Sequence, residues 1–317
     1  MAVPFTQLVA TTFDDVVTER NKSADQWSDS SALMKLESIG GVKRVSGGAT
    51  LQLPLDYRQN PALDFLATDT TPTSTAKTDV LTAASYTYVP YVVPVNYTLM
   101  DEALNSEKSQ KVDLVTSIVD NMLVSHDQGI EAGLFAATGG TDGFNTFIDI
   151  YTEDGTGTVG TIVSGTETWF KSQFKDWAAD TGATLLADYN TLYFACAKGS
   201  SGRQPNVVIG NSTLYGSFVA ALTANQRWVG NTTTAKHGFD NVKLNNADYI
   251  YTSVITTAQD SAFMFNTADT KLYVVRGAWR QRRPAIESIN SILINIKTFS
   301  VLQLATSNRS RGGVLFT

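Results

Sequence analysis

Residues 42–98 combine a β-strand pattern with too few apolar residues to form a core of their own. One run, "ATLQLPLDY", alternates through Leu51 and Leu53, and a second, "ASYTYVPYVVPVNYTL", alternates from Tyr86 and Tyr88. Prolines in both runs disfavour a central place in a sheet, because each removes a hydrogen-bond donor from the ladder. The stretch between the runs, "ATDTTPTSTAKTD", is polar. The pattern predicts an exposed two-stranded excursion that another subunit stabilises, since an isolated hairpin is marginally stable in water.

A long amphipathic helix is predicted after this excursion. Side chains on one face recur every three or four residues from Val112 through Val119 and Met122 to Leu134. The glycines of "TGGTDG" end the pattern. About 28 helical residues would form a rod of roughly 42 Å, at ~1.5 Å per residue. A helix of this length after an extended hairpin is unusual in a compact enzyme.

From about residue 170 the sequence is typical of mixed helices and strands. Helices are predicted over 168–179, 183–198 and 211–227. Strands are predicted at 205–211 and 247–255, with a β-hairpin over 261–277 that turns at "NTADTK". The segment 288–306 is β-rich, and we interpret "SNRSRGG" after it as a short polar tail.

Gly155, Gly157 and Gly160 match the G-x-G-x-x-G spacing of dinucleotide-binding loops, and an apolar stretch, "FIDIY", precedes them. Such a loop must open a helix, because the helix N-terminus holds the pyrophosphate. The residues that follow, "TIVSGTET", are β-branched and interrupted by glycine, which does not favour a helix. We therefore interpret the motif as a Gly/Thr loop or hairpin turn and expect no cofactor.

No set of residues predicts catalysis or a metal site. His126 and His237 are far apart in the sequence, and His126 falls on the apolar face of the long predicted helix. Cys196 is the only cysteine, which excludes an internal disulfide and any zinc site built from cysteines. No G-x-S-x-G nucleophile motif is present. We expect a protein that is not an enzyme, with no catalytic, cofactor-binding or metal-binding residues.

Charge is sparse in this chain. Charged residues make up 17% of it and the formal net charge is −6, against about a quarter charged residues in typical domains. A chain with few surface charges is consistent with one that is covered by copies of itself. The acidic balance does not favour a nucleic-acid-binding module. No window of ~18 apolar residues suggests a membrane span, and the N-terminus lacks the pattern of a secretory signal.

Two charged groups and four apolar residues are candidate inter-subunit contacts. The segment "VRGAWRQRRPAIES" is the one basic cluster; it is open to three interpretations, an exposed loop, pairing with carboxylates of another subunit, or contact with nucleic-acid phosphates. Three carboxylates near the N-terminus form either a solvated or an inter-subunit face. The candidates are Arg276, Arg280, Arg282, Arg283, Asp14, Asp15, Glu19, Leu51, Leu53, Tyr86 and Tyr88.

The order of these elements resembles the major capsid protein of tailed bacteriophages, with the Hong Kong 97-type fold. An arm leads to the extended hairpin, "GGATLQLPLDYRQNP … SYTYVPYVVPVNYTLMDEAL". The long helix, "SEKSQKVDLVTSIVDNMLVSHDQGIEAGLFAATGG", follows, and an α/β segment carries "QPNVVIGNSTLYGSFVAAL" before a β-rich return. The resemblance covers essentially the whole chain and rests on architecture, because the family has no invariant catalytic motif.

The resemblance implies an α+β fold with five parts. They are an N-terminal arm (1–41), an extended loop (42–98), a peripheral domain (99–169) with a spine helix (106–137), an axial domain (170–270) and return strands into the peripheral domain (271–317). Some family members cross-link a lysine of the extended loop to a neighbour. Lys77 is the only lysine at the tip here, and we expect no cross-link.

The implied function is that of a coat subunit. Hexamers and pentamers would form an icosahedral shell around double-stranded DNA, assembled in the bacterial cytoplasm and retained in the virion. The implied partners are the chain itself, a portal, separate scaffolding or decoration proteins, and DNA that is held weakly and without sequence specificity. The alternatives are an encapsulin-like shell around enzyme cargo, a tail-tube or other virion protein, and an enzyme whose site the sequence does not reveal.

Overall fold

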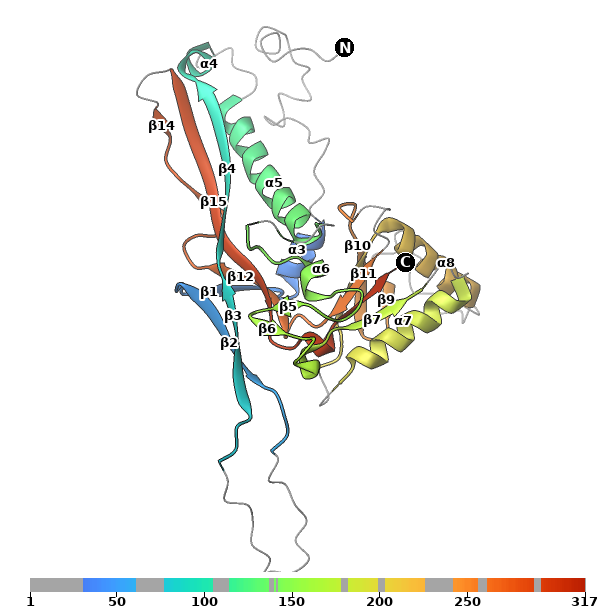
Figure 1. Ribbon diagram of the computed structural model, residues 1–317. Coiled ribbons are helices and arrows are strands. Elements are labelled where there is room, and N and C mark those ends of the chain that lie inside the picture. The colour runs from blue at the N-terminus through green and yellow to red at the C-terminus, as the bar shows by residue number, and fades with distance from the viewer. Residues whose placement is uncertain are drawn as a thin grey trace, which may run out of the picture.

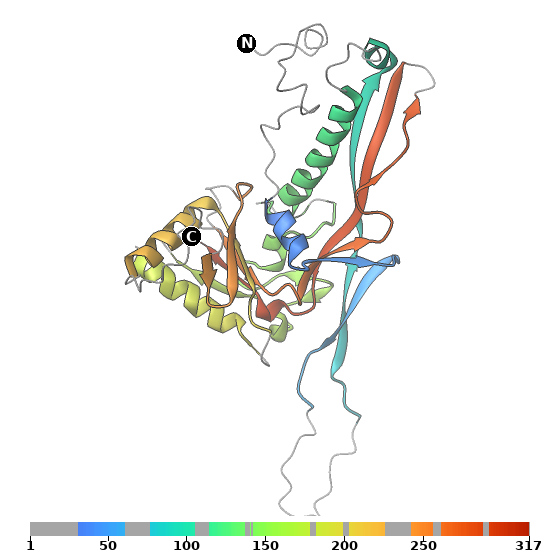
Figure 2. The same ribbon diagram turned by 180° about the vertical axis from the view of Figure 1, so that it is seen from behind.

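The structure is a computed structural model that describes residues 31–60, 77–104, 114–136, 140, 142–177, 182–198, 203–225, 242–255, 261–287 and 292–316. It has three parts. Long strands and helix α5 form an elongated peripheral part, a second sheet with two helices forms a rounder part beside it, and a two-stranded hairpin projects away from both (Figures 1 and 2). This mixture of helices and strands agrees with the expected α+β class.

The first sheet is organised around β15 (Leu293–Thr306). Strand β4 (Val89–Thr98) pairs with it in antiparallel register from Leu302 to Leu293. Along the opposite edge of β15 lie β12 (Thr270–Val275), β13 (Gln281–Arg282) and β14 (Ile286–Glu287), and β1 (Val42–Val45) pairs in parallel with β12. Strand β15 therefore has neighbours on both edges, whereas β4 pairs only with β15 among the described strands.

The prolines of β2 and β4 lie where the sequence predicted them. Pro90 and Pro94 occupy exposed positions of the edge strand β4, and Pro54 lies in β2, which pairs only with β3 in the described part of the chain. The prediction that these prolines avoid central strands is confirmed. The covered face of the sheet packs against α5, where Met122 meets Ile294 and Ile296.

The predicted long helix is present as α5 (Leu114–Leu134), and residues 105–113 before it lie outside the described part. A short helix, α4 (Leu99–Leu104), follows β4. Helix α3 (Ser31–Ser38) packs against α5, while residues 1–30, including Asp14, Asp15 and Glu19, lie outside the described residues. One apolar core joins α3, α5, the root of the hairpin and strands of both sheets.

The projecting hairpin is shorter than the predicted excursion over 42–98. It consists of β2 (Thr50–Asp56) and β3 (Leu81–Thr87), in register from Thr50–Thr87 to Asp56–Leu81. Both β1 and β4 belong to the first sheet instead. The reason is that "YVVPVNYT" finds a long-range partner in β15, which the alternating pattern alone cannot reveal. The hairpin tip, 61–76, lies outside the described residues.

The second sheet has the order β7-β16-β11-β8-β10-β9. Its strands are β7 (Gln173–Asp176), β8 (Val207–Gly210), β9 (Val242–Leu244), β10 (Ala247–Tyr251), β11 (Ala262–Phe265) and β16 (Gly313–Phe316). Helices α7 (Gly182–Cys196) and α8 (Ser212–Asn225) cover it, and Tyr189 and Phe218 fill the core between helices and sheet. The predicted helices at 183–198 and 211–227 and the predicted buried strand at 205–211 are confirmed in these described elements. The Asn211 side chain caps α8 by accepting from the Leu214 N–H at 2.8 Å.

Three sequence predictions for this region are wrong. Residues 173–176 form β7, paired with β16, where a helix was predicted; Phe174 is 50% exposed, so the aromatic spacing does not build a buried helix face. The predicted hairpin over 261–277 does not form, because β11 pairs with β8 and β16 while β12 pairs with β1 and β15. The chain therefore crosses between the sheets at 266–269. The final strand, β16, lies in the second sheet, whereas all of 271–317 was expected to return to the first.

Candidate assembly surfaces

The glycine-rich motif supports the root of the hairpin. Strands β5 (Thr158–Val159) and β6 (Ile162–Val163) form a small hairpin whose turn, Gly160–Thr161, has φ values of +57° and +68°. The Gly160 carbonyl accepts a hydrogen bond from the Ser85 N–H at 2.9 Å. A Cβ atom on Gly160 would lie 2.7 Å from the Tyr86 ring, so only glycine allows this approach. The interpretation of the motif as a hairpin turn is confirmed.

A buried arginine holds this loop in place. Arg309 is fully buried and donates to the hydroxyls of Ser164 (2.8 Å) and Thr152 (3.0 Å), to the Thr156 carbonyl (2.8 Å) and to the Ile150 carbonyl. Burial lowers the pKa of Arg309, and the nearby Tyr151, Asp154 and Tyr86 offset this only in part. The interpretation of "SNRSRGG" as a polar tail is wrong. No local sequence pattern predicts the burial of Arg309, because its hydrogen-bond partners Ser164 and Ile150 lie 145 and 159 residues earlier.

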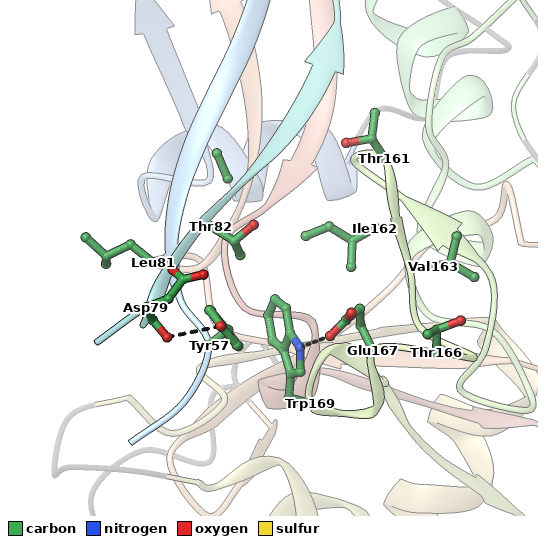
Figure 3. A pocket seen from close by; sticks show the side chains of 11 residues that line it. Tyr57, Asp79, Leu81, Thr82, Thr161, Ile162, Val163, Thr166, Glu167 and Trp169 are labelled. Carbon is green, nitrogen blue, oxygen red and sulfur yellow. Dashed lines mark hydrogen bonds between the residues drawn. The ribbon is translucent and has the colours of Figure 1, made fainter. Parts of the chain in front are cut away.

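An open pocket separates the hairpin root from the loop after β6 (Figure 3). Its volume is about 590 Å³. Tyr57, whose hydroxyl donates to the Asp79 carbonyl at 3.0 Å, lies on the hairpin side. On the loop side, the Trp169 Nε1–H donates to the Glu167 carboxylate at 2.6 Å. The remaining lining residues are Leu81, Thr82, Ala83, Thr161, Ile162, Val163 and Thr166.

The four apolar candidate contacts of the hairpin pack largely against their own chain. Tyr86 is 3% exposed, and its hydroxyl donates to the Thr306 carbonyl at 2.8 Å. Burial raises the pKa of Tyr86, so its hydroxyl remains protonated. Leu51, Leu53 and Tyr88 are half-buried against the same core. Tyr86 is therefore a core residue, which corrects the expectation that it contacts another subunit.

Arg280 also differs from the expectation. Its Nε donates to Asp127 at 2.8 Å, and its Nη1 donates to Glu37 at 3.1 Å, so both of its ion pairs are within the chain. Burial alone would raise the pKa of Asp127, but hydrogen bonds from His126 and Arg280 and the charge of Arg280 lower it below its usual range. Arg280 thus joins α3 to α5 and is occupied within the subunit.

The other three arginines of the basic cluster, Arg276, Arg282 and Arg283, are exposed. The Arg283 guanidinium lies over the Phe299 ring, 4.7 Å from its centroid. All of 281–287, which includes β13 and β14, is exposed, and Ile286 presents 60% of its surface to solvent. The cluster therefore divides into one internal ion-pairing residue and three surface residues.

The described residues contain no group of three or more His, Cys, Asp or Glu side chains placed to hold a metal ion. Burial raises the pKa of Cys196 to about 12, so its thiol is protonated and unreactive. His126 is buried, with Nε2 2.9 Å from the Ser300 hydroxyl, and His237 lies outside the described part. No helix in the described ranges is both long and apolar enough to cross a membrane.

Comparison with solved structures identifies the fold. No protein-family model and no curated protein matches the sequence. The structure is similar to the capsid subunit of cyanophage A-1(L) (13% identity, TM-score 0.62, covering 92% of this chain and 94% of that one) and to the capsid of the native GTA particle (10%, 0.66, 93% and 92%). It is also similar to the SrpI encapsulin from Synechococcus elongatus (11%, 0.58, 96% of each chain). The chain has the Hong Kong 97-type fold of phage capsid proteins.

Proposed function

We propose that this chain is a major capsid subunit, which assembles as hexamers and pentamers into an icosahedral shell around double-stranded DNA. The observation that carries the proposal is similarity over more than nine-tenths of the chain to subunits of capsids. The match includes both sheets, so it is not a similarity of one common motif. The virion is the corresponding location, with assembly in the host cytoplasm.

The exposed parts of the chain fit a subunit that is completed by its neighbours. In the described part of the chain the hairpin contributes Leu55, Ala84 and Tyr86 to the core, and two strands alone are marginally stable in water. The segment 281–287 is exposed along its whole length. A closed symmetric assembly repeats each modest contact many times, so weak surfaces produce a stable particle.

The electrostatics fit a container that holds DNA loosely. The net charge is −6, and each additional phosphate contact would resist packing and release of DNA. A portal and separate scaffolding or decoration proteins would complete the particle.

The subunits are expected to remain without covalent cross-links. Lys77 is exposed beside the hairpin tip, and denaturing gels of the particle should show single subunits of normal size.

The second candidate is an encapsulin-like shell that encloses an enzyme, which the similarity to the SrpI encapsulin favours. The contents of the particle distinguish the two. A capsid subunit expressed with its packaging partners should yield particles whose DNA is protected from nuclease. An encapsulin-like shell should instead co-purify with one stoichiometric protein.

The test is assembly of the purified recombinant chain, followed by size-exclusion chromatography and negative-stain electron microscopy. Shells, or rings of five and six subunits, are the expected result. A folded monomer that stays monomeric at high concentration, with crowding agents and with co-expressed scaffolding candidates, would overturn the proposal.

A further inference from the structure

Two exposed surfaces of this chain match each other in charge and apolar character. One is the hairpin-root pocket, lined by Tyr57, Asp79, Leu81, Val163, Glu167 and Trp169 among others. The other is the 281–287 segment, which contains β13 and β14. The segment pairs with β15, and in Figure 1 β14 lies well above the projecting hairpin, whereas β5 and β6 lie beside it. The two surfaces of one chain therefore do not meet.

The hairpin-root pocket is suited to a cationic side chain. Asp79 and Glu167 lie on opposite walls, and neither carboxylate forms an ion pair with a cation of the described residues (Figure 3). The Tyr57 and Trp169 rings lie beside them, with centroids 5.6 Å apart. A planar guanidinium both pairs with carboxylates and stacks on aromatic faces, which an ammonium does less well. The pocket therefore favours arginine.

Two further features define the pocket rim. Leu81 and Val163 are 68% and 48% exposed, which leaves apolar surface for a partner to cover. Arg58 also lies at the rim; its Nε donates to the Asp79 carbonyl at 2.7 Å and its guanidinium lies 5.2 Å from the Tyr57 ring centroid. Arg58 thus covers one side of the tyrosine and leaves the lining carboxylates unpaired.

The 281–287 segment supplies the complementary groups. Arg282 is exposed and has no ion-pair partner among the described residues. Ile286 is 60% exposed, and Glu287 is the one acid of the segment. Arg283 is held over Phe299, so Arg282 is the cation free to reach a second molecule.

We propose that the 281–287 segment of one copy docks in the hairpin-root pocket of the next copy. Arg282 inserts between Asp79 and Glu167, and Ile286 covers Leu81 and Val163. Glu287 then faces Arg58 at the rim. This inference rests on the proposed function, which it deepens by naming the contact. Because the two surfaces differ, the contact is head-to-tail and closes into a ring when its rotation permits.

A charge exchange tests the contact. Glu167→Arg and Arg282→Glu should each raise the concentration needed for assembly by at least about tenfold, because each places like charges together. The double variant should restore assembly toward that of the natural chain. Matched controls are Glu153→Arg and Lys198→Glu, exposed residues outside both surfaces, which should assemble normally. Thermal unfolding of each variant verifies that the subunit is folded. Single variants that assemble normally, or a double variant that fails while both controls assemble, would overturn the contact.

Cross-linking supplies a readout that depends on proximity. A chain with Glu167→Cys and Arg282→Cys, treated with a short bismaleimide after assembly, should give a ladder of covalent oligomers. The buried, protonated Cys196 should not react. A chain with Glu153→Cys and Arg282→Cys should give none. Shells without a ladder overturn this contact and leave the capsid function standing, whereas a natural chain that never forms rings or shells overturns both.

Discussion

The Glu131 carboxylate, within α5, accepts a 2.6 Å hydrogen bond from the Thr252 hydroxyl, which is 121 residues later in the chain. It also accepts from the Leu33 N–H at the start of α3, at 2.9 Å. Glu131 and Thr252 are both fully buried. One carboxylate therefore connects the helix of the peripheral part, the base of the N-terminal segment and the end of β10 in the second sheet.

Removing the Thr252 hydroxyl should destabilise the subunit. Thr252→Val keeps the shape but leaves the buried Glu131 side chain with one fewer donor, at a cost of about 1–3 kcal/mol for a buried polar group that loses its partner. Thr252→Ser is the matched control, because it keeps the hydroxyl and loses one methyl group, worth about 0.8 kcal/mol. Urea unfolding of dissociated subunits measures both. Equal losses in the two variants would contradict a stabilising role for the hydrogen bond.

Gly160 should tolerate alanine less well than Gly143 does. Both have positive φ, +57° and +82°, so each alanine costs about 1–2 kcal/mol in backbone strain. At Gly160 the new Cβ would also lie 2.7 Å from the Tyr86 ring and 2.9 Å from the Ala84 Cβ, whereas at Gly143 it meets nothing within 4 Å. The unfolding free energy that Gly160→Ala loses beyond the loss in Gly143→Ala measures the contact with the hairpin root.

Gly160→Ala should also loosen the hairpin itself. The Ser85 N–H bonds to the Gly160 carbonyl, so hydrogen exchange at Ser85 should become faster in Gly160→Ala and stay unchanged in Gly143→Ala. Unchanged protection of Ser85 in both variants would show that the small β5–β6 hairpin does not support β3.

Arg309 should be intolerant of lysine. A lysine cannot reproduce the planar fork, so at least one buried acceptor among Thr156 and Ile150 would lose its donor, at about 1–3 kcal/mol each. We expect Arg309→Lys to lower the unfolding free energy by about 2–5 kcal/mol. Arg203→Lys is the control: its side chain is 56% exposed and its ion pair with Asp269 is 3.6 Å long, so the loss should stay below about 1 kcal/mol. Similar losses at both positions would contradict the structural role of Arg309.

Local sequence patterns were sufficient to predict those elements whose structure is determined within one segment of the chain. The apolar spacing through Val119 and Met122 predicted α5, because a helix makes its backbone hydrogen bonds within one segment. Pro90 and Pro94 predicted an edge position for their strand, because proline lacks the backbone N–H that a central strand would use. The order of such elements was enough to suggest the fold.

Long-range partners explain what the sequence did not predict. Phe174 lies in a strand because β16, at the other end of the chain, pairs with β7. Arg280 and Arg282 stand two residues apart and look equivalent in the sequence, yet only Arg280 meets Asp127 and Glu37. Arg309 is buried against a loop that contains Ser164, which is 145 residues earlier in the sequence. Each partner is set by packing between distant segments, which residue spacing does not record.

Acid sensitivity should depend on Asp127. Hydrogen bonds from His126 and Arg280 and the charge of Arg280 outweigh burial and lower the pKa of Asp127 below its ordinary value of 3.8. Because the unfolded chain binds this proton more readily, the stabilisation is present in full above the ordinary pKa and is lost as pH falls through the folded pKa. Asp127→Asn does not titrate, so its unfolding free energy should fall less steeply between about pH 5 and pH 2.

Arg280→Gln should weaken the acid response in the same direction as Asp127→Asn does. Without the guanidinium, the burial of Asp127 opposes its charged form with only the His126 hydrogen bond to offset it, so the pKa of Asp127 rises. The difference between the folded and unfolded pKa values becomes smaller, so the unfolding free energy of Arg280→Gln should be lower near neutral pH and should fall less between about pH 5 and pH 2 than that of the natural subunit. Urea unfolding at a series of pH values, on dissociated subunits, measures all three chains. Parallel pH curves for the natural chain and both variants would show that the Asp127–Arg280 pair does not govern acid stability.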